Sequence, residues 1–371
     1  MMPFNRQKIR PNGFIKVLCY LAMALCHTLF SACKSDKPSP RPENPPVLLP
    51  EGSSNVLVVN EGNFQFENAS LTFVNGKTAE CTSDAFKVSN GRKLGDVAQS
   101  AVVWNGRMYV VVNNSQKIEV LDAQSFRSIA TVSGFISPRY ILPISYSKAY
   151  VSDLYANNIS VLNLNTYTVE KKIPCSGWTE RMLYHLGKVY VTNYWQPYLY
   201  VIDPASDTKT DSIYIGKGAQ SMVVDKWDRI VVACGGYKTS KSDTRLVYVN
   251  PYSKKVEKTI ETGTNFPSNV LVNNSRDTLY FLLTAIGGGT EKYSSVGVCK
   301  MAVDANDVTA PFITGNARNL YALGLDGKTN RLYVSDAVDN NQVGKVYMYS
   351  PSGQELGKFD AGINPGNFCF Y

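Results

Sequence analysis

Residues Lys188–Asp203 read KVYVTNYWQPYLYVID, two short apolar segments separated by a polar and aromatic turn. The segments VYVT and LYVI alternate aromatic and β-branched residues, a pattern typical of half-buried β-strands. A turn between such strands needs only small polar residues, yet this one places Tyr194, Trp195 and Tyr198 there. The stretch therefore predicts a β-hairpin whose turn carries three large aromatic side chains.

The first strand of this hairpin recurs along the chain, most often followed by a polar turn and a second strand. The other copies are NVLVVNEG from Asn55, RMYVVVNN from Arg107, KAYVSDLY from Lys148, RIVVACGG from Arg229, TLYFLLTA from Thr278 and RLYVSDAV from Arg331. Glycines mark the repeat at spacings of 39 to 52 residues: Gly95, Gly134, Gly177, Gly218, Gly263, Gly315 and Gly362. After each glycine a few polar residues lead into another apolar strand, so each unit contains about four short strands.

Four antiparallel strands that recur about every 40–50 residues are typical of a β-propeller. Neighbouring blades bury each other's faces, and closing the ring leaves no exposed end. The first unit begins at Asn55 on its second strand, and the last glycine is followed by a single strand. We therefore expect residues 366–371 to supply the innermost strand of the first blade. The predicted fold is all-β: a seven-bladed propeller of four-stranded antiparallel blades over residues 55–371, closed by pairing of the two termini.

The first 32 residues predict a targeting segment that is not part of the fold. A basic stretch up to Lys16 precedes the apolar run VLCYLAMALCHTLF, which is short for a membrane-spanning helix of about 20 residues. The run ends in Ser31-Ala32-Cys33, which is similar to the lipobox of bacterial lipoproteins, although Phe30 stands where leucine is usual. We expect residues 1–32 to be a signal peptide and Cys33 to be lipidated. Ordinary cleavage near an incidental cysteine is the alternative.

Residues 33–54 predict a spacer between the lipid and the propeller. The stretch from Ser35 to Ser54 contains six prolines and few apolar residues, so it cannot pack and is expected to be extended. A spacer of this kind suits a domain that stands away from a membrane.

The composition argues against several classes of function. The net charge of +8 falls to +4 without the first 32 residues, and the basic residues are scattered, so a nucleic-acid surface is not indicated. His185 is the single histidine after the targeting segment, which leaves little for a zinc site or a Ser-His-Asp triad. Five widely spaced cysteines follow Cys33 without metal-ligand spacing: Cys81, Cys175, Cys234, Cys299 and Cys369. We expect no cofactor, no metal site and no enzymatic activity.

Strand direction predicts which residues share one face of the ring. In an antiparallel meander, the turns between second and third strands lie at the same end as the glycine-containing connections between blades. The candidate ligand-binding residues on this face are Phe64, Asn113, Arg139, Tyr155, Trp178, Arg181, Tyr194, Trp195, Tyr198, Tyr237 and Arg318. Aromatic rings with a few convergent polar groups suit a large, partly apolar, hydrogen-bonding ligand. An aromatic in a propeller turn can also serve only to cover its own blade.

The segments MYVVVNN, VYVTNYW and AYVSDLY resemble the YVTN-type propeller repeat, and the resemblance covers residues 55–371. Together with the lipobox and the proline-rich spacer, they resemble surface lipoproteins of Bacteroidota, among them the cobalamin-capturing proteins of the BtuG type. The resemblance implies binding of vitamin B12 or a related corrinoid on one face of the propeller. It also implies transfer to a TonB-dependent transporter and a lipid-anchored place on the outer membrane at the cell surface. The segment KSDK after Cys33 is less acidic than the export signals usual in that group.

Two other functions remain open from the residues. The same face could contact a protein or a glycan at the cell surface without any small-molecule ligand. A propeller hydrolase with a calcium-type oxygen site could use four carboxylates of this face: Glu61, Asp96, Asp153 and Asp336. Solvated turn carboxylates are the simpler interpretation of these four residues, and no nucleophile–base pair accompanies them.

Overall fold

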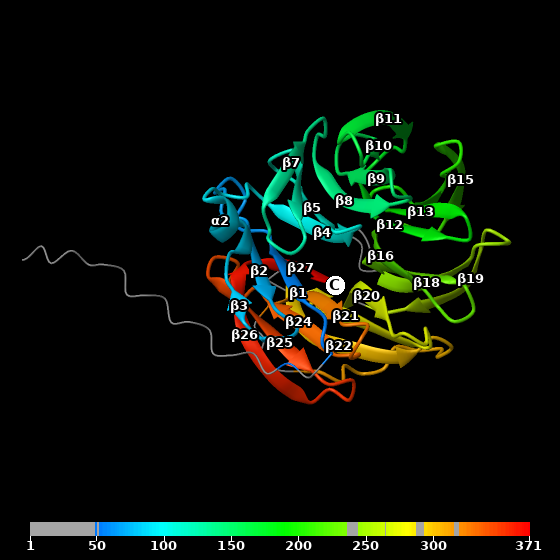
Figure 1. Ribbon diagram of the computed structural model, residues 1–371. Helices are drawn as coiled ribbons and strands as arrows, with labels where there is room; N and C mark the ends of the chain where they lie inside the picture. Colours follow the sequence, from blue (N-terminus) through cyan, green and yellow to red (C-terminus); the bar gives the residue numbers. More distant parts are fainter. Residues whose placement is uncertain (1–48, 50–51, 236–243, 264, 287–292, 315–318) are drawn as a thin grey trace, which may run out of the picture. The chain divides into compact units, whose positions relative to one another are not determined.

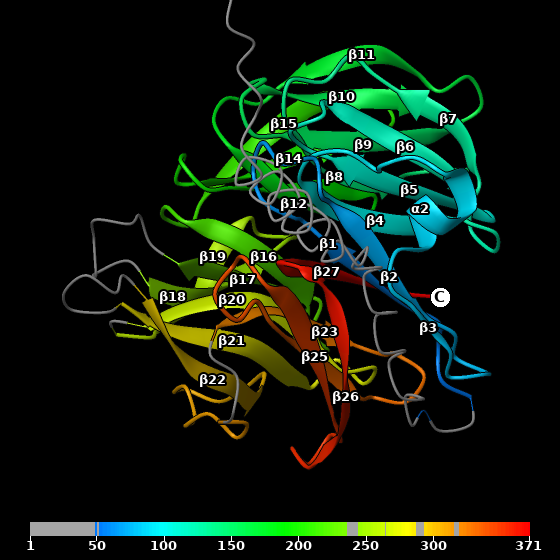
Figure 2. The same cartoon turned by 90° about the vertical axis from the view of Figure 1, so that its left-hand side faces the viewer.

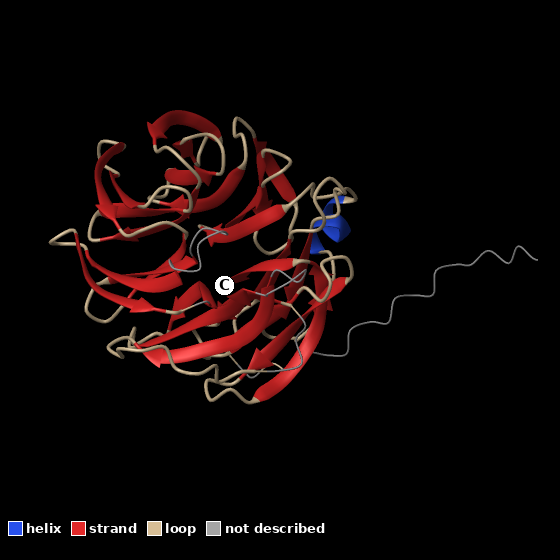
Figure 3. Cartoon of the chain, turned by 180° about the vertical axis from the view of Figure 1, so that it is seen from behind, coloured by secondary structure: helices blue, strands red, loops and turns tan. Residues whose placement is uncertain are grey.

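The computed structural model describes residues 49, 52–235, 244–263, 265–286, 293–314 and 319–371. These residues form seven antiparallel sheets arranged as blades around a central axis (Figure 1), and they fall in one compact unit. Figure 3 shows the same ring from the other side. The prediction of a seven-bladed all-β propeller is confirmed.

Blades two to five are four-stranded meanders that run outward from the axis. Blades two and three contain β4 (Ala98–Trp104), β5 (Arg107–Val112), β6 (Lys117–Asp122) and β7 (Ser128–Val132), then β8 (Pro138–Pro143), β9 (Lys148–Asp153), β10 (Asn158–Asn163) and β11 (Thr168–Pro174). Blades four and five contain β12 (Thr179–His185), β13 (Lys188–Asn193), β14 (Tyr198–Asp203) and β15 (Thr208–Tyr214), then β16 (Ala219–Val224), β17 (Ile230–Gly235), β18 (Thr244–Asn250) and β19 (Lys255–Glu261).

Burial changes from the middle of a blade to its edge, and this explains the recurring apolar segment. The second strands β13 and β17 are buried along almost their whole length because neighbouring blades cover both of their faces. The outermost strand β15 is exposed at most positions and keeps only Ile213 buried. The repeat that the sequence displays is therefore the second strand of each blade.

The two ends of the described chain close the ring in blade one. Its order is β27 (Pro365–Phe370), β1 (Val56–Asn60), β2 (Ser70–Val74) and β3 (Cys81–Thr82), and Figure 2 shows β27 beside β1. Phe370 pairs with Val56, and Asn55 and Tyr371 exchange backbone hydrogen bonds of 2.9 and 3.2 Å. The innermost strands touch in the order β27, β4, β8, β12, β16, β20, β23 and again β27. The predicted closure by residues 366–371 is confirmed.

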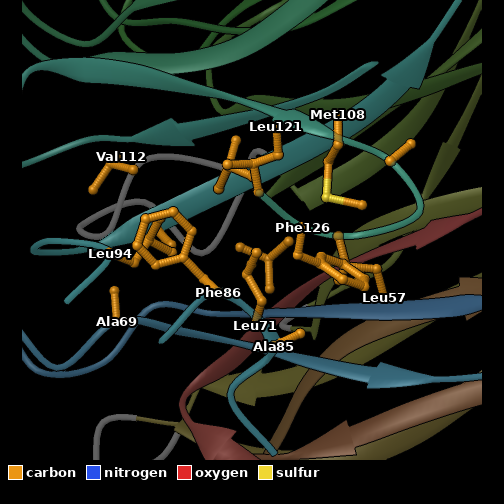
Figure 4. Close-up of a cluster of buried hydrophobic side chains, with 14 residues drawn as sticks. Leu57, Ala69, Leu71, Ala85, Phe86, Leu94, Met108, Val112, Leu121 and Phe126 are labelled. Carbon is orange, nitrogen blue, oxygen red and sulfur yellow. The ribbon is translucent and has the colours of Figure 1, made fainter. Parts of the chain in front are cut away.

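Blade one also contains an element that the sequence analysis did not predict. Its outer strand β3 has only two residues, and the short helix α2 (Ala85–Asn90) follows, capped by the Asp84 side chain. Figure 4 shows Phe86 of this helix among the buried side chains that join blades one and two, with Leu71 and Leu94 nearby. The helix therefore covers apolar surface that a longer outer strand would cover elsewhere.

Blades six and seven complete the ring. They contain β20 (Asn265–Val272), β21 (Thr278–Ile286) and β22 (Tyr293–Ala302), then β23 (Leu320–Leu325), β24 (Leu332–Asp336), β25 (Val343–Tyr349) and β26 (Glu355–Ile363). Within the described residues, blade six has three strands, and its outer position holds the isolated bridge between Val298 and Ile313. Pro311 lies beside this bridge, and a proline cannot donate to a strand ladder.

Deletion of residues 366–371 is expected to destabilise the whole propeller instead of loosening one edge. The deletion removes nearly all of β27 and exposes β1, whose five residues are all buried. The truncated protein should no longer show a single cooperative transition in thermal or denaturant unfolding followed by circular dichroism. Phe368→Ala, which removes a ring packed near Tyr333, is expected to cost about 2–3 kcal/mol.

The control for this experiment is Val88→Ala, which removes an exposed apolar side chain from helix α2. Its unfolding free energy should stay within about 0.5 kcal/mol of wild type. An unchanged melting temperature in the truncated protein would rule out closure by β27.

Candidate functional site

The inner end of each blade departs from regular pairing, and this departure aims side chains at the ring axis. In blade three, Pro138 pairs with Asp153 and the next pair is Ile141 with Val151, so Arg139 and Tyr140 form a bulge. A bulge bends its strand and re-aims the extra side chains. The register between the innermost strand and its neighbour shifts in this way in every blade of the described chain.

The bulged residues of the blades line one pocket of about 320 Å³. In blade order they are Gly366, Gln99, Arg139, Glu180, Gln220, Asn269 and Tyr321. Tyr140, Arg181, Trp178, Tyr194 and Glu61 add to the lining. Because each blade contributes, the pocket lies on the ring axis, and its lining combines four charged side chains with amides and aromatic rings.

An ion pair between blades three and four dominates one side of the pocket. The Arg139 guanidinium donates to both carboxylate oxygens of Glu180, with Nη2 at 2.7 Å from Oε1 and Nε at 3.1 Å from Oε2. It also donates to Oε1 of Gln99, and the Trp178 indole donates to Glu180 at 2.5 Å. Burial opposes the positive charge, but Glu180 more than offsets it, so the pKa of Arg139 is raised. Arg139 therefore keeps its charge, and each member of the pair has hydrogen-bond partners.

A second pair of side chains joins blades one and seven. The Tyr321 hydroxyl donates to Oε2 of Glu61 at 2.6 Å. Burial raises the pKa of Glu61 above its usual value of 4.5, against the opposing effects of the Tyr321 hydrogen bond and the Arg139 charge. Burial and the adjacent Glu61 charge raise the pKa of Tyr321 well above 10, so this phenol remains a donor.

The turn after β13 places Tyr194 and Trp195 in different environments. Asn193 accepts hydrogen bonds from the backbone nitrogens of Trp195 and Gln196 and so fixes the turn. Tyr194 is only 9% exposed and packs 4.8 Å from the Trp178 ring, at the wall of the pocket. Trp195 is 38% exposed, and its ring lies edge-on to the Trp178 ring at a centroid distance of 5.8 Å.

We call Trp178, Tyr194, Trp195 and Tyr155 the aromatic rim. Tyr155, from the corresponding turn of blade three, lies 6.2 Å from Trp195 and is 58% exposed. Trp178 contacts the ion pair on its other side, because its ring lies 5.4 Å from the Arg139 guanidinium carbon. The rim is therefore a continuous aromatic surface from the pocket wall to solvent.

The structure brings some of the sequence candidates together and separates others. Arg139, Trp178, Arg181 and Tyr194 line the pocket, while Trp195 and Tyr155 extend it as the rim. Tyr198 packs against Tyr214, Phe64 is exposed in its turn, and Asn113 donates to Ser137 and to the Pro138 carbonyl. None of these last three lines the pocket. Tyr237 and Arg318 lie outside the described residues.

Several pocket residues were not among the sequence candidates: Gln99, Tyr140, Glu180, Asn269 and Tyr321. Their signal is positional, since each lies one or two residues into its innermost strand or at the bulge of that strand. Alignment of the blades at the glycine connections does not identify these positions, because they follow the glycine by different numbers of residues, three from Gly177 to Glu180 and six from Gly134 to Tyr140. Residue type alone does not identify them either, because Gln and Tyr are common elsewhere in the chain.

The four carboxylates considered for a calcium-type site do not come together. Among the described residues, no group of three or more His, Cys, Asp or Glu side chains could hold a metal ion. Asp153 accepts instead from the backbone nitrogens of Ser137 and Tyr155, and Asp96 accepts from Gln65 and Asn114. Asp336 likewise accepts a hydrogen bond from the backbone nitrogen of Val338. The described part of the chain also has no helix that is long and apolar enough to cross a membrane.

Comparisons with known proteins identify a family and a fold. The profile of a family described as "Domain of unknown function (DUF5074)" matches residues 54–362. No curated protein matches this chain. Hydrazine synthase of Kuenenia stuttgartiensis is similar in structure, with a TM-score of 0.64 and 13% identity over 73% of this chain and 89% of that chain.

Two further solved structures have the same architecture. A quinonprotein alcohol dehydrogenase-like protein of Bacteroides thetaiotaomicron has a TM-score of 0.66 and 14% identity over 86% of this chain and 78% of that chain. A protein of Lactobacillus plantarum has a TM-score of 0.63 and 12% identity over 86% and 99% of the two chains. Similarities at identities this low show that the propeller fold is shared, and they assign no activity of these proteins to this chain.

Glu61→Gln is expected to flatten the pH dependence of stability above about pH 4.5. Because the folded pKa of Glu61 is raised, the native state holds this proton more tightly than the unfolded chain does. The free energy of unfolding therefore falls as pH rises through the interval between the two pKa values. Glutamine accepts the Tyr321 hydrogen bond but does not ionise, so the variant gains stability relative to wild type as pH rises.

Urea unfolding at several pH values between about 4 and 7 measures this difference. Glu67→Gln, which removes an exposed carboxylate from the same turn, should keep the wild-type pH dependence. Parallel stability curves for wild type and Glu61→Gln would contradict the raised pKa.

Proposed function

The chain belongs to the DUF5074 family, and we propose that it is a non-enzymatic, surface-anchored lipoprotein that captures a ligand at the axial pocket and its aromatic rim. The proposed ligand is cobalamin or a related corrinoid. The proposed route passes the ligand to a TonB-dependent transporter of the outer membrane, with the lipid on Cys33 as the anchor.

The observation that carries this proposal is the continuity of the polar pocket with a half-exposed aromatic surface. A corrinoid has a broad apolar ring whose edge carries many amide groups. The pocket is too small to enclose the whole ring, so we expect the ring to lie against Trp195 and Tyr155 while amide arms enter the pocket. Gln220 and Asn269 have the amide groups that pair with such arms.

The chemistry of the pocket favours binding over catalysis. Arg139 and Glu180 are held against each other and are not poised for proton transfer with a substrate. Ser221 is the hydroxyl-bearing residue of the lining besides the tyrosines, and its oxygen accepts from the Val270 nitrogen. The lining of the described pocket contains no histidine or cysteine that could activate or act as a nucleophile.

A spectroscopic experiment tests the ligand directly. Purified protein is incubated with cyanocobalamin, desalted and scanned for corrinoid absorbance. Co-elution of about one corrinoid per protein supports the proposal. Complete separation of the two rejects a corrinoid ligand and favours the alternative, a surface propeller that contacts a protein or a glycan through the same exposed aromatics.

Trp195→Ala is expected to weaken corrinoid binding about thirtyfold while the melting temperature changes little. A half-exposed aromatic that a ligand covers contributes about 2 kcal/mol to binding, whereas its removal from the free protein exposes little new surface. Isothermal titration and a thermal melt on the same samples measure both quantities.

Trp227→Ala is the matched control for this variant. Trp227 is 62% exposed and lies in the turn between β16 and β17, at the opposite face of the ring from the rim. Its removal should change neither affinity nor stability. Tyr194 lies in the same turn as Trp195 but is buried against Trp178, so Tyr194→Ala is expected to lower the melting temperature as well. A large loss of stability in Trp195→Ala with unchanged binding would show instead that Trp195 only covers the core of its own blade.

Cys33→Ser is expected to release the protein from the membrane fraction or to leave an unprocessed precursor. A serine at this position cannot form the thioether through which lipoproteins carry their diacylglycerol. Fractionation of cells and labelling with a radioactive fatty acid measure the effect, with Cys81→Ser as a control for the loss of another thiol. Membrane retention with normal maturation and no lipid label would exclude the lipobox interpretation.

A further inference from the structure

The side chains of the axial pocket divide into two groups by their hydrogen bonding. The locked half consists of Gln99, Arg139 and Glu180 together with the Glu61–Tyr321 pair, and its members satisfy one another. The open half consists of Arg181, Gln220 and Asn269 on blades four, five and six. Within the described part of the chain, none of these three side chains forms a hydrogen bond or an ion pair.

Arg181 is held in place without using its donors. Its guanidinium carbon lies 4.1 Å from the centre of the Tyr140 ring, which belongs to the neighbouring blade. Tyr140 is itself fixed, since its backbone nitrogen donates to Ser152 at 3.1 Å. A guanidinium that rests on an aromatic face leaves the N–H donors at its edge available to a ligand.

The charge balance of the pocket leaves Arg181 as the cation without a counter-charge in direct contact. Arg139 and Glu180 neutralise each other through several hydrogen bonds. The remaining carboxylate, Glu61, accepts a hydrogen bond from the Tyr321 hydroxyl at 2.6 Å. An uncompensated cation in a concave site attracts an anion more strongly than the same cation on an open surface.

We propose that the open half binds an oxygen anion, a carboxylate or a phosphate, that a ligand inserts along the ring axis. The edge of Arg181 can donate two parallel hydrogen bonds to such a group. The amide groups of Gln220 and Asn269 lie on the next two blades and can donate to its remaining oxygens. The inference rests on the proposed function only in assigning the ligand to this pocket, because the anion site can be tested without any corrinoid.

Titration with inorganic phosphate and with acetate tests the site, with sodium chloride at equal ionic strength as the reference. Calorimetry and the shift in melting temperature report the affinity, since an anion that binds only the native state raises the melting temperature. Arg181→Met should weaken the binding about tenfold or more. The anion that binds wild type more tightly identifies the group, carboxylate or phosphate.

Lys217→Met is the matched control because it removes one exposed positive charge from a connection on the same face. It should bind both anions as wild type does. Arg181→Lys, which keeps the charge and loses the planar fork, should fall between wild type and Arg181→Met. Gln220→Met tests the same half of the pocket independently of the Arg181–Tyr140 contact and should weaken the binding severalfold.

Two results would overturn the anion site: wild type that shows no saturable response to either anion, or equal affinities in wild type and Arg181→Met. The outcomes for the two proposals are distinguishable. Corrinoid co-elution that is insensitive to Arg181→Met, without anion binding, removes the anion site and keeps the capture function. Anion binding that depends on Arg181, without corrinoid co-elution, supports the anion site and rejects the corrinoid.

Discussion

The pairing of β27 with β1 is the constraint on which both the fold and the site depend. Without it, blade one lacks an innermost strand, and the buried faces of β1 and of the neighbouring strands β4 and β23 lose their cover. The same strand also completes the pocket through Gly366. A Cβ at this glycine would lie 2.5 Å from the Glu61 carboxylate, so a larger residue would push Glu61 away from Tyr321. The strand that closes the ring therefore also completes the pocket.

The ion pair between Arg139 and Glu180 gives the pocket its shape more than it gives the protein stability. Removing two charges from water is costly, and the attraction between them offsets that cost only where further hydrogen bonds complete the geometry. Gln99 and Trp178 supply those bonds here. Loss of one partner would leave a buried charge without compensation. The pair thus links blades three and four in a fixed orientation, and it positions Trp178 at the base of the aromatic rim.

The sequence was sufficient for the fold because each blade repeats the same buried second strand. It did not predict helix α2 or the three-stranded sheet of blade six, since both arise where a local segment replaces a strand of the repeat. For the site, strand direction placed Arg139, Trp178 and Arg181 on one face, and the structure brings these three into one pocket. Which arginine pairs with Glu180 and which rests on Tyr140 depends on the bulges and on the angle between blades three and four. Residue spacing contains neither quantity.

A ring of similar blades presents equivalent positions to its axis, and a ligand that lacks this symmetry can be recognised only if the blades differ there. This chain places interacting charged and amide residues on blades two, three and four and amide residues on blades five and six. Among the described residues, the large exposed aromatics that extend the pocket wall come from blades three and four. Backbone closure thus provides a common frame, and the side chains at the bulges make it asymmetric. The side chains at the bulges therefore distinguish one blade from the next, whereas the strands behind them can vary as long as the blades still pack.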